Sequence, residues 1–177
     1  MKHSNSKRET TLRFLAEPTQ VNFGGKVHGG SVMKWIDQAG YACAAGWTGQ
    51  YCVTVYVSGI RFYRPVLIGS VVEVQAKLIY TGTTSAHVLV SVRAGDPRTN
   101  QYLETCDSVI VFVAVDDQGR PVEIKNRWYP ETAGDRWLEN FAKRTMEFGK
   151  SIEEEMRTYP NTQPASKTQS RIFNYES

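Results

Sequence analysis

The sequence lacks long apolar runs and is poor in cysteine, and each lack excludes a class of protein. No stretch approaches the roughly 18 consecutive apolar residues of a membrane span. No apolar run follows the charged residues near Met1, so a secretory signal is not expected. The cysteines lie in no CxxC spacing and beside no histidine pair, which indicates neither a disulfide framework nor a zinc site; they are Cys43, Cys52 and Cys106. A cytoplasmic protein without a membrane or metal partner is therefore expected.

The sequence also lacks a large excess of either sign of charge. The net charge of +3 over 177 residues is too small to argue for nucleic-acid binding, although it mildly favours a polyanionic small molecule. Gly29 and Gly30 are adjacent, but no Lys-Ser or Lys-Thr pair follows them, so a Walker phosphate loop is excluded. Apolar residues make up 41% of the chain and charged residues 22%, as in a soluble protein with one core.

The spacing of apolar residues predicts a strand, a helix and then four long strands. Residues 10–15 read as a short strand, and residues 31–45 are apolar almost all round at helical spacing, which is typical of a buried helix. Between residues 53 and 115 the period is 2, with a phase slip at Gly59 that suggests a bulge. The last of these strands is apolar on both faces in its second half, as a central strand would be. Short connectors favour antiparallel neighbours, so the fold class is α+β, with the sheet packed on one central helix.

Helical spacing returns after Pro130. One stripe carries the large apolar residues, which predicts an amphipathic helix that covers the sheet or a neighbouring subunit; they are Trp137, Phe141, Phe148, Ile152 and Met156. From Pro160 the composition is typical of a disordered tail.

Three features could carry chemistry. Asp37 is a lone carboxylate in the predicted buried helix, where it is either functional or held by a structural hydrogen bond. The Gly29 N–H, with Gly30 as a second candidate donor, could stabilise an oxyanion at the helix start, or this junction is a tight turn with Ser31 as N-cap. Asn22 lies in the loop before it and, taken alone, reads as a turn residue.

Together these residues resemble a known family. The spacing Asn22-x6-Gly29-Gly30-x6-Asp37 within VHGGSVMKWIDQAG is similar to the active-site segment of hot-dog acyl-CoA thioesterases, specifically the acyl-CoA hydrolases of bacteria and the mammalian cytosol. Val53-Thr54-Val55, FYRPVLIGSVVEV, YTGTTS and YLETCDSVIVFVAVDDQGRPV extend the resemblance over about residues 10–125. Ser70 departs from the family, which more often has Asp there.

The resemblance implies a hot-dog fold, an antiparallel sheet wrapped around a central helix, with a C-terminal helical extension. The expected organisation is a mobile N-terminus (1–9), the thioesterase domain (10–127), the amphipathic extension (128–158) and a disordered tail (159–177). It also implies hydrolysis of fatty acyl-CoA to a free fatty acid and coenzyme A. Coenzyme A is then part of substrate and product, and no separate cofactor or metal is required.

Spacing restricts where the reaction could occur. Gly29 and Asp37 are eight residues apart, or ~12 Å along a helix axis, so one thioester carbonyl cannot contact both within a subunit. Two antiparallel copies of the helix would bring Asp37 of one chain to Gly29 and Asn22 of the other. The family has the same arrangement, which implies a homodimer with shared sites and a higher oligomer of dimers. Asp37 would act as general base or as nucleophile, and Asn22 would orient the water or the carbonyl.

The resemblance also indicates residues that face coenzyme A, although each reads equally as a solvated base or a turn hydroxyl; they are Arg64, Thr83, Thr84, Ser85 and Arg93. Two other functions stay open. A non-catalytic acyl-CoA-binding regulator would need no Asp–Asn pair and would usually carry a DNA-binding segment, which the first thirty residues do not suggest. A hot-dog dehydratase would need a catalytic histidine, for which His28 is the one candidate; we expect His28 and His87 to be structural.

Overall fold

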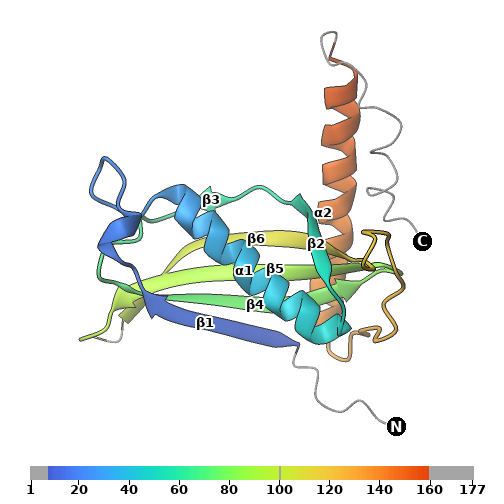
Figure 1. Ribbon diagram of the computed structural model, residues 1–177, viewed down its shortest axis with the longest axis horizontal. Coiled ribbons are helices and arrows are strands. Elements are labelled where there is room, and N and C mark those ends of the chain that lie inside the picture. The colour runs from blue at the N-terminus through green and yellow to red at the C-terminus, as the bar shows by residue number, and fades with distance from the viewer. Residues whose placement is uncertain (1–7, 100, 160–177) are drawn as a thin grey trace.

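An antiparallel sheet curves around one long helix in the computed structural model, which describes residues 8–99 and 101–159 (Figure 1). The strand order is β1-β4-β5-β6-β2, with β3 beside β6. This architecture confirms the predicted α+β class. Most of the predicted mobile N-terminus (1–9) and tail (159–177) lies outside the described residues. The strands are β1 (Glu9–Leu15), β2 (Cys52–Val57), β3 (Arg61–Phe62), β4 (Val71–Thr81), β5 (Ser85–Asp96) and β6 (Gln101–Ala114).

Strand β6 is central, as its two apolar faces predict, because it lies between β5 and β2. An irregularity lies where the sequence predicts a bulge, at Gly59. Val57 at the end of β2 pairs with Ile110 and Arg61 at the start of β3 pairs with Asp107, so four residue steps oppose three along β6. Between the two strands the Ser58 hydroxyl accepts a hydrogen bond from the Val109 N–H at 2.8 Å. A second register shift, which the sequence does not predict, lies earlier, between Thr54 and Tyr56 of β2.

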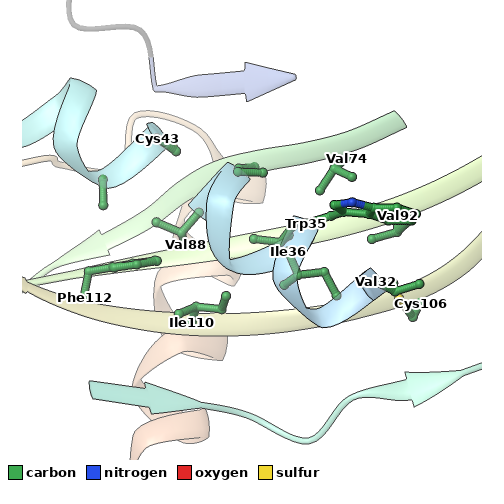
Figure 2. Packing of buried hydrophobic residues seen from close by; sticks show 14 of the residues in the cluster. Val32, Trp35, Ile36, Cys43, Val74, Val88, Val92, Cys106, Ile110 and Phe112 are labelled. Atoms are coloured by element: carbon green, nitrogen blue, oxygen red, sulfur yellow. The ribbon is translucent and has the colours of Figure 1, made fainter. Parts of the chain in front are cut away.

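Helix α1 (Gly29–Thr48) is longer than predicted and ends at Gly49, whose φ of 67° is left-handed. It packs on one face of the sheet, and Figure 2 shows Val32 and Ile36 among side chains of the strands. The expectation of a helix buried all round is wrong for the single chain, because Met33, Asp37 and Tyr41 are exposed. Its buried residues are Val32, Trp35, Ile36, Ala39, Gly40, Cys43 and Ala44.

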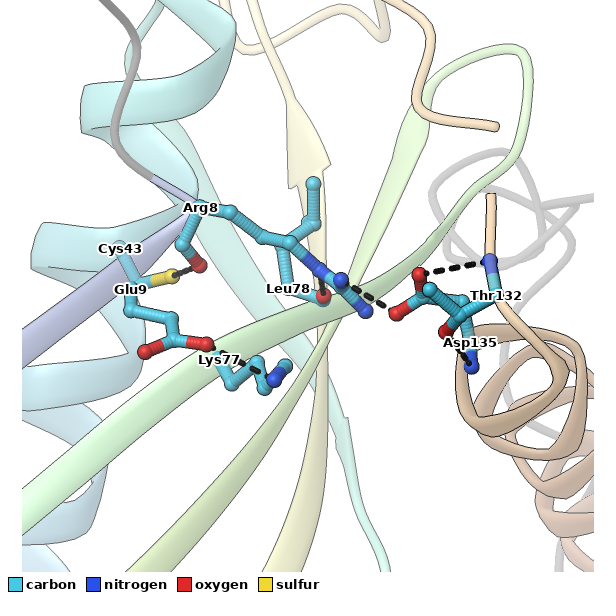
Figure 3. A network of polar contacts seen from close by, with 7 residues as sticks. All are labelled: Arg8, Glu9, Cys43, Lys77, Leu78, Thr132 and Asp135. Carbon is cyan, nitrogen blue, oxygen red and sulfur yellow. Dashed lines mark hydrogen bonds and ion pairs between the residues drawn. The ribbon is translucent and has the colours of Figure 1, made fainter. Parts of the chain in front are cut away.

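Helix α2 (Ala133–Arg157) lies on the opposite face of the sheet. A capping box between Thr132 and Asp135 begins it, and Arg8 bonds to both Asp135 and the Leu78 carbonyl, which fixes this helix end beside β1 and β4 (Figure 3). Neither described helix has the long apolar stretch that a bilayer crossing requires.

The predicted apolar stripe of α2 coincides only in part with the face that packs on the sheet of this chain. The residues that pack on the sheet are mainly Leu138, Ala142 and Gly149, with Phe141 half-buried beside them. Most of the large apolar residues remain exposed because small residues allow the helix to approach the strands closely; they are Trp137, Phe148, Ile152 and Met156.

Candidate active site

Asp37 lies on the exposed side of α1, next to β2. Its Oδ1 accepts a hydrogen bond from the Thr54 hydroxyl at 2.6 Å. The carboxylate is therefore solvated and oriented by one partner, instead of isolated in an apolar interior as its place in the helix predicts. Its second oxygen is left available to a ligand.

The irregular register of β2 aims Thr54 at this carboxylate. Residues two apart in a regular strand point to the same face. Here Thr54 contacts α1, whereas Tyr56 lies against Gly149 of α2, on the other face. The extra residue, Val55, produces this change of direction, as a β-bulge does.

The start of α1 presents backbone donors. His28 is the N-cap, and its Nδ1 accepts the Gly30 N–H at 3.0 Å, so the alternative of Ser31 as N-cap is wrong. Within the described residues the Gly29 N–H has no acceptor, which leaves it at the positive end of the helix dipole. The expected structural role of His28 agrees with this capping bond.

Asn22 is fixed in the loop that precedes the helix. Its Oδ1 accepts the N–H groups of Gly24 and Lys26 at 2.9 and 3.1 Å, and its Nδ2 reaches the Val27 carbonyl only at 3.5 Å. The side-chain N–H groups are thus the less satisfied part of this amide, and they are the part that could donate to a ligand. The His28 N–H bonds to the Gln20 carbonyl at 2.8 Å and ties this loop to the helix start.

The candidate residues of one chain form two separate groups. The loop and the helix start carry Asn22 and Gly29, whereas Asp37 lies about two turns, or ~12 Å, further along α1, where Thr54 of β2 contacts it. Among the described residues no hydrogen bond joins Asp37 to Asn22 or Gly29.

The predicted coenzyme A residues do not form one cluster. Arg64 lines a groove of about 590 Å³ near the start of β4, and its guanidinium donates to the Glu104 carbonyl at 3.1 Å. At the other end of β4, Thr83 and Thr84 are half-exposed in the turn to β5. Ser85 is buried, with its hydroxyl 3.3 Å from His87 Nε2.

Arg93 lies on the sheet face opposite α1. Its Nε is 2.6 Å from Glu73, which Arg13 also approaches at 3.3 Å. Neither this ion-pair cluster nor the groove beside Arg64 contains the candidate catalytic residues.

The three cysteines and His87 are buried. The three cysteines are free thiols, and burial raises the pKa of Cys43 to about 11 and that of Cys106 to about 12. Burial lowers the pKa of His87 to about 3, so its ring is neutral. No three metal-ligating side chains gather anywhere in the described parts of the chain.

Thr54 is a candidate site residue that the periodicity does not reveal, because threonine is common in strands. Its place in Val53-Thr54-Val55, a segment shared with the family, was the one signal that could have identified it.

Known proteins resemble this chain in sequence and in fold. A family model described as thioesterase superfamily matches residues 24–100. The acyl-CoA thioester hydrolase YciA of Escherichia coli is 34% identical over 123 residues, covering 67% of this chain and 92% of its own. An acyl-CoA hydrolase from Staphylococcus aureus, solved with butyryl coenzyme A and coenzyme A, has a TM-score of 0.76 at 27% identity and covers 86% of this chain and 92% of its own.

A third relative is the hexameric thioesterase y2039 from Yersinia pestis, with a TM-score of 0.61 at 34% identity, covering 64% of this chain and 92% of its own. These likenesses confirm the predicted hot-dog fold.

The Staphylococcus aureus hydrolase has also been solved as three variants in which one asparagine, one aspartate or one threonine is replaced by alanine. Along that chain the asparagine and aspartate are 15 residues apart, and the aspartate and threonine 17. Asn22, Asp37 and Thr54 have the same separations.

Proposed function

Since the chain belongs to the acyl-CoA thioesterases of the thioesterase superfamily, we propose that it hydrolyses fatty acyl-CoA to a free fatty acid and coenzyme A at sites shared between two subunits. The observation that carries the proposal is the Thr54–Asp37 hydrogen bond. It fixes a carboxylate on the open side of α1, and its two residues together with Asn22 reproduce the spacing of the three substituted residues in the Staphylococcus aureus enzyme.

In this proposal each subunit contributes one group of candidate residues to a shared site: Asp37 with Thr54 from one chain, and Asn22 with Gly29 from the other. A twofold axis that sets two α1 helices antiparallel brings Asp37 of one protomer opposite Asn22 and Gly29 of its partner. The Gly29 N–H then donates to the thioester oxygen as negative charge develops on it, supported by the positive helix end. The hexameric state of y2039 supports self-association, here as a dimer and a higher oligomer of dimers.

Two routes remain for Asp37. As general base it takes a proton from water, whose oxygen attacks the thioester carbonyl. The tetrahedral intermediate then collapses, the carbon–sulfur bond breaks, and coenzyme A leaves as a thiolate that takes up the proton. As nucleophile, the carboxylate attacks the carbonyl, expels the thiolate and forms a mixed anhydride that water hydrolyses. Both routes consume only water, so neither requires a cofactor or metal.

The supporting residues have distinct roles in this proposal. Thr54 is a positioning residue, because its hydroxyl holds one carboxylate oxygen and leaves the other for water or substrate. Asn22 orients the water or carbonyl with its side-chain N–H groups. Arg64 binds a coenzyme A phosphate from the rim of its groove, whereas Thr83 and Thr84 lie beyond the other end of β4 and do not line that groove. Two assigned contacts lack such support, because Ser85 is buried and Arg93 is ion-paired.

The proposed location is the cytoplasm, which the three free, buried thiols support, since a reducing compartment keeps cysteines unpaired.

Release of the coenzyme A thiol from short, medium and long acyl-CoAs tests the function and defines the substrate class. Asp37→Asn should lower kcat by roughly 100-fold or more while the protein stays dimeric by sedimentation. Asp117→Asn is the matched control, because this exposed acid lies in the turn after β6 and should leave kcat unchanged. A dimeric Asp37→Asn protein with near-normal kcat would exclude Asp37 from the reaction.

A further inference from the structure

The face of α2 that packs on the sheet continues beyond the sheet. Leu138, Ala142, Thr145 and Gly149 recur at helical spacing, and all four are buried or half-buried. Ile152 and Met156 extend the same line by two turns, yet they are 54% and 62% exposed. Ile152 is therefore an apolar residue on the packing side of the helix with no sheet of its own chain beneath it.

The path of α2 explains this exposure. From its start beside β1, the helix crosses the strands in their order: Leu138 and Ala142 pack near Ile79 of β4 and Val109 of β6. Gly149 then meets Tyr56 of β2, the last strand, so closely that a Cβ would lie 2.8 Å from the ring. The eight remaining residues add ~12 Å, which equals more than two strand spacings of ~4.8 Å. Figure 1 shows the C-terminal part of α2 standing clear of the sheet.

Other apolar residues are exposed along the same edge. Met33 and Tyr41 lie on the open side of α1, and Tyr51 and Val57 lie at the two ends of β2. Asp37 is on this side too, bonded to β2. A second copy that completes the proposed shared site must therefore approach along β2, which is an edge strand with one side free to pair.

We propose that the last two turns of α2, residues 150–157, lie on the outer face of a second copy's sheet and hold the two subunits together across β2. Ile152 is ~4.5 Å beyond Gly149 along the helix axis, which places it over the partner subunit's copy of β2. Met156, at ~10.5 Å, lies over the strand beyond it. The twofold axis repeats the contact, so residues 150–157 of each subunit pack on the sheet of the other; we call this pair of contacts the clasp.

The relatives differ in how much of the chain they match: the Staphylococcus aureus hydrolase covers 86% of it and y2039 covers 64%. The inference rests on the proposed function for the direction of approach, but its readouts are association and amide exchange, which do not depend on turnover.

The test uses the full chain and two serine variants on the same helix. Ile152→Ser should raise the dissociation constant of the assembly about tenfold or more in sedimentation across a concentration series, because each assembly loses two buried isoleucines. Trp137→Ser is the matched control: Trp137 is 58% exposed, but it lies at the first turn, over its own sheet, and should change the constant less than threefold. Amides of residues 150–157 should also lose protection from hydrogen exchange on dilution below the dissociation constant.

Equal constants for wild type and Ile152→Ser, or equal weakening by both variants, would overturn the inference. So would protection of residues 150–157 that does not change on dilution, because the C-terminal residues 160–177 or another partner would then cover this face. The proposed function is tested separately: an Asp37→Asn protein that is inactive but associates normally leaves the clasp intact, and an active monomer refutes the shared site itself.

Discussion

The hydroxyl of Thr54 gives the candidate acid its orientation, and this contact can be removed without altering the acid. Thr54→Val keeps the shape of the side chain but removes the donor to Asp37. We expect kcat to fall about fivefold, the equivalent of a net hydrogen bond of about 1 kcal/mol. Thr54→Ser keeps a hydroxyl and should retain most of the activity. Equal rates in the thiol-release assay for the valine and serine variants would mean that the hydroxyl positions nothing.

His87 should make stability depend on pH. Burial lowers its pKa from 6.5 to about 3, so below pH 6.5 the unfolded chain binds a proton that the folded chain does not. Protonation thus favours unfolding as the pH falls, and wild type should lose ~2 kcal/mol of unfolding free energy between pH 7 and 5.

The control for this residue is His87→Leu, which removes the titrating ring. Urea unfolding of this variant at both pH values, at one protein concentration, should show the loss reduced by most of that amount. The Arg8 hydrogen bond lowers the pKa of Asp135 to about 2. The contribution of this carboxylate to the free energy of unfolding is therefore lost only below about pH 4, outside the range compared. The same slope in both proteins would contradict the assignment.

Among the elements, α1 packs closely on the sheet at Gly40, where the absence of a side chain makes room for the ring of Phe112. A Cβ at Gly40 would lie 2.9 Å from the Phe112 ring, whereas nothing lies within 4 Å of one at Gly46 in the same helix. Gly46→Ala should therefore stabilise the protein by about 0.5–1 kcal/mol through helix propensity alone. Gly40→Ala should instead destabilise it by about 1–3 kcal/mol because the core is overpacked. Thermal unfolding of the pair measures both signs, and a stabilising Gly40→Ala would refute this close approach.

The elements also show what periodicity can and cannot predict. Strands β4, β5 and β6 are predictable because alternate residues enter one core, and α1 because its apolar face is wide. The contact face of α2 is not, because Ala142 and Gly149 carry almost no hydrophobic signal while larger residues point elsewhere. The spacing of Asn22, Gly29 and Asp37 could be recognised along the chain. Thr54 contacts Asp37 because the register of β2 shifts between Thr54 and Tyr56, and no local sequence pattern predicts this shift.

At the scale of the whole molecule, shared sites predict complementation between inactive variants. Asp37→Asn and Asn22→Ala should each be inactive alone. In a mixed dimer one site carries both substitutions and the other carries none, so random assortment restores about a quarter of the wild-type activity. Co-expression with two affinity tags isolates the mixed dimer, which has one intact site of two and should show about half of the wild-type activity in the thiol-release assay. Differently tagged copies of Asp37→Asn serve as the control. Sites contained within one subunit would give no recovery.

Side chains along a regular strand alternate between the two faces of the sheet, and the extra residue Val55 interrupts this alternation in β2. Thr54 therefore contacts α1, which carries Asp37, whereas Tyr56 contacts α2 on the other face of the sheet. Deleting Val55 would restore the regular alternation and remove one of these two contacts, whichever way the strand realigned. The orientation of Asp37 and the path of α2 thus both depend on one residue of backbone length, and a longer or shorter strand would disturb one or the other.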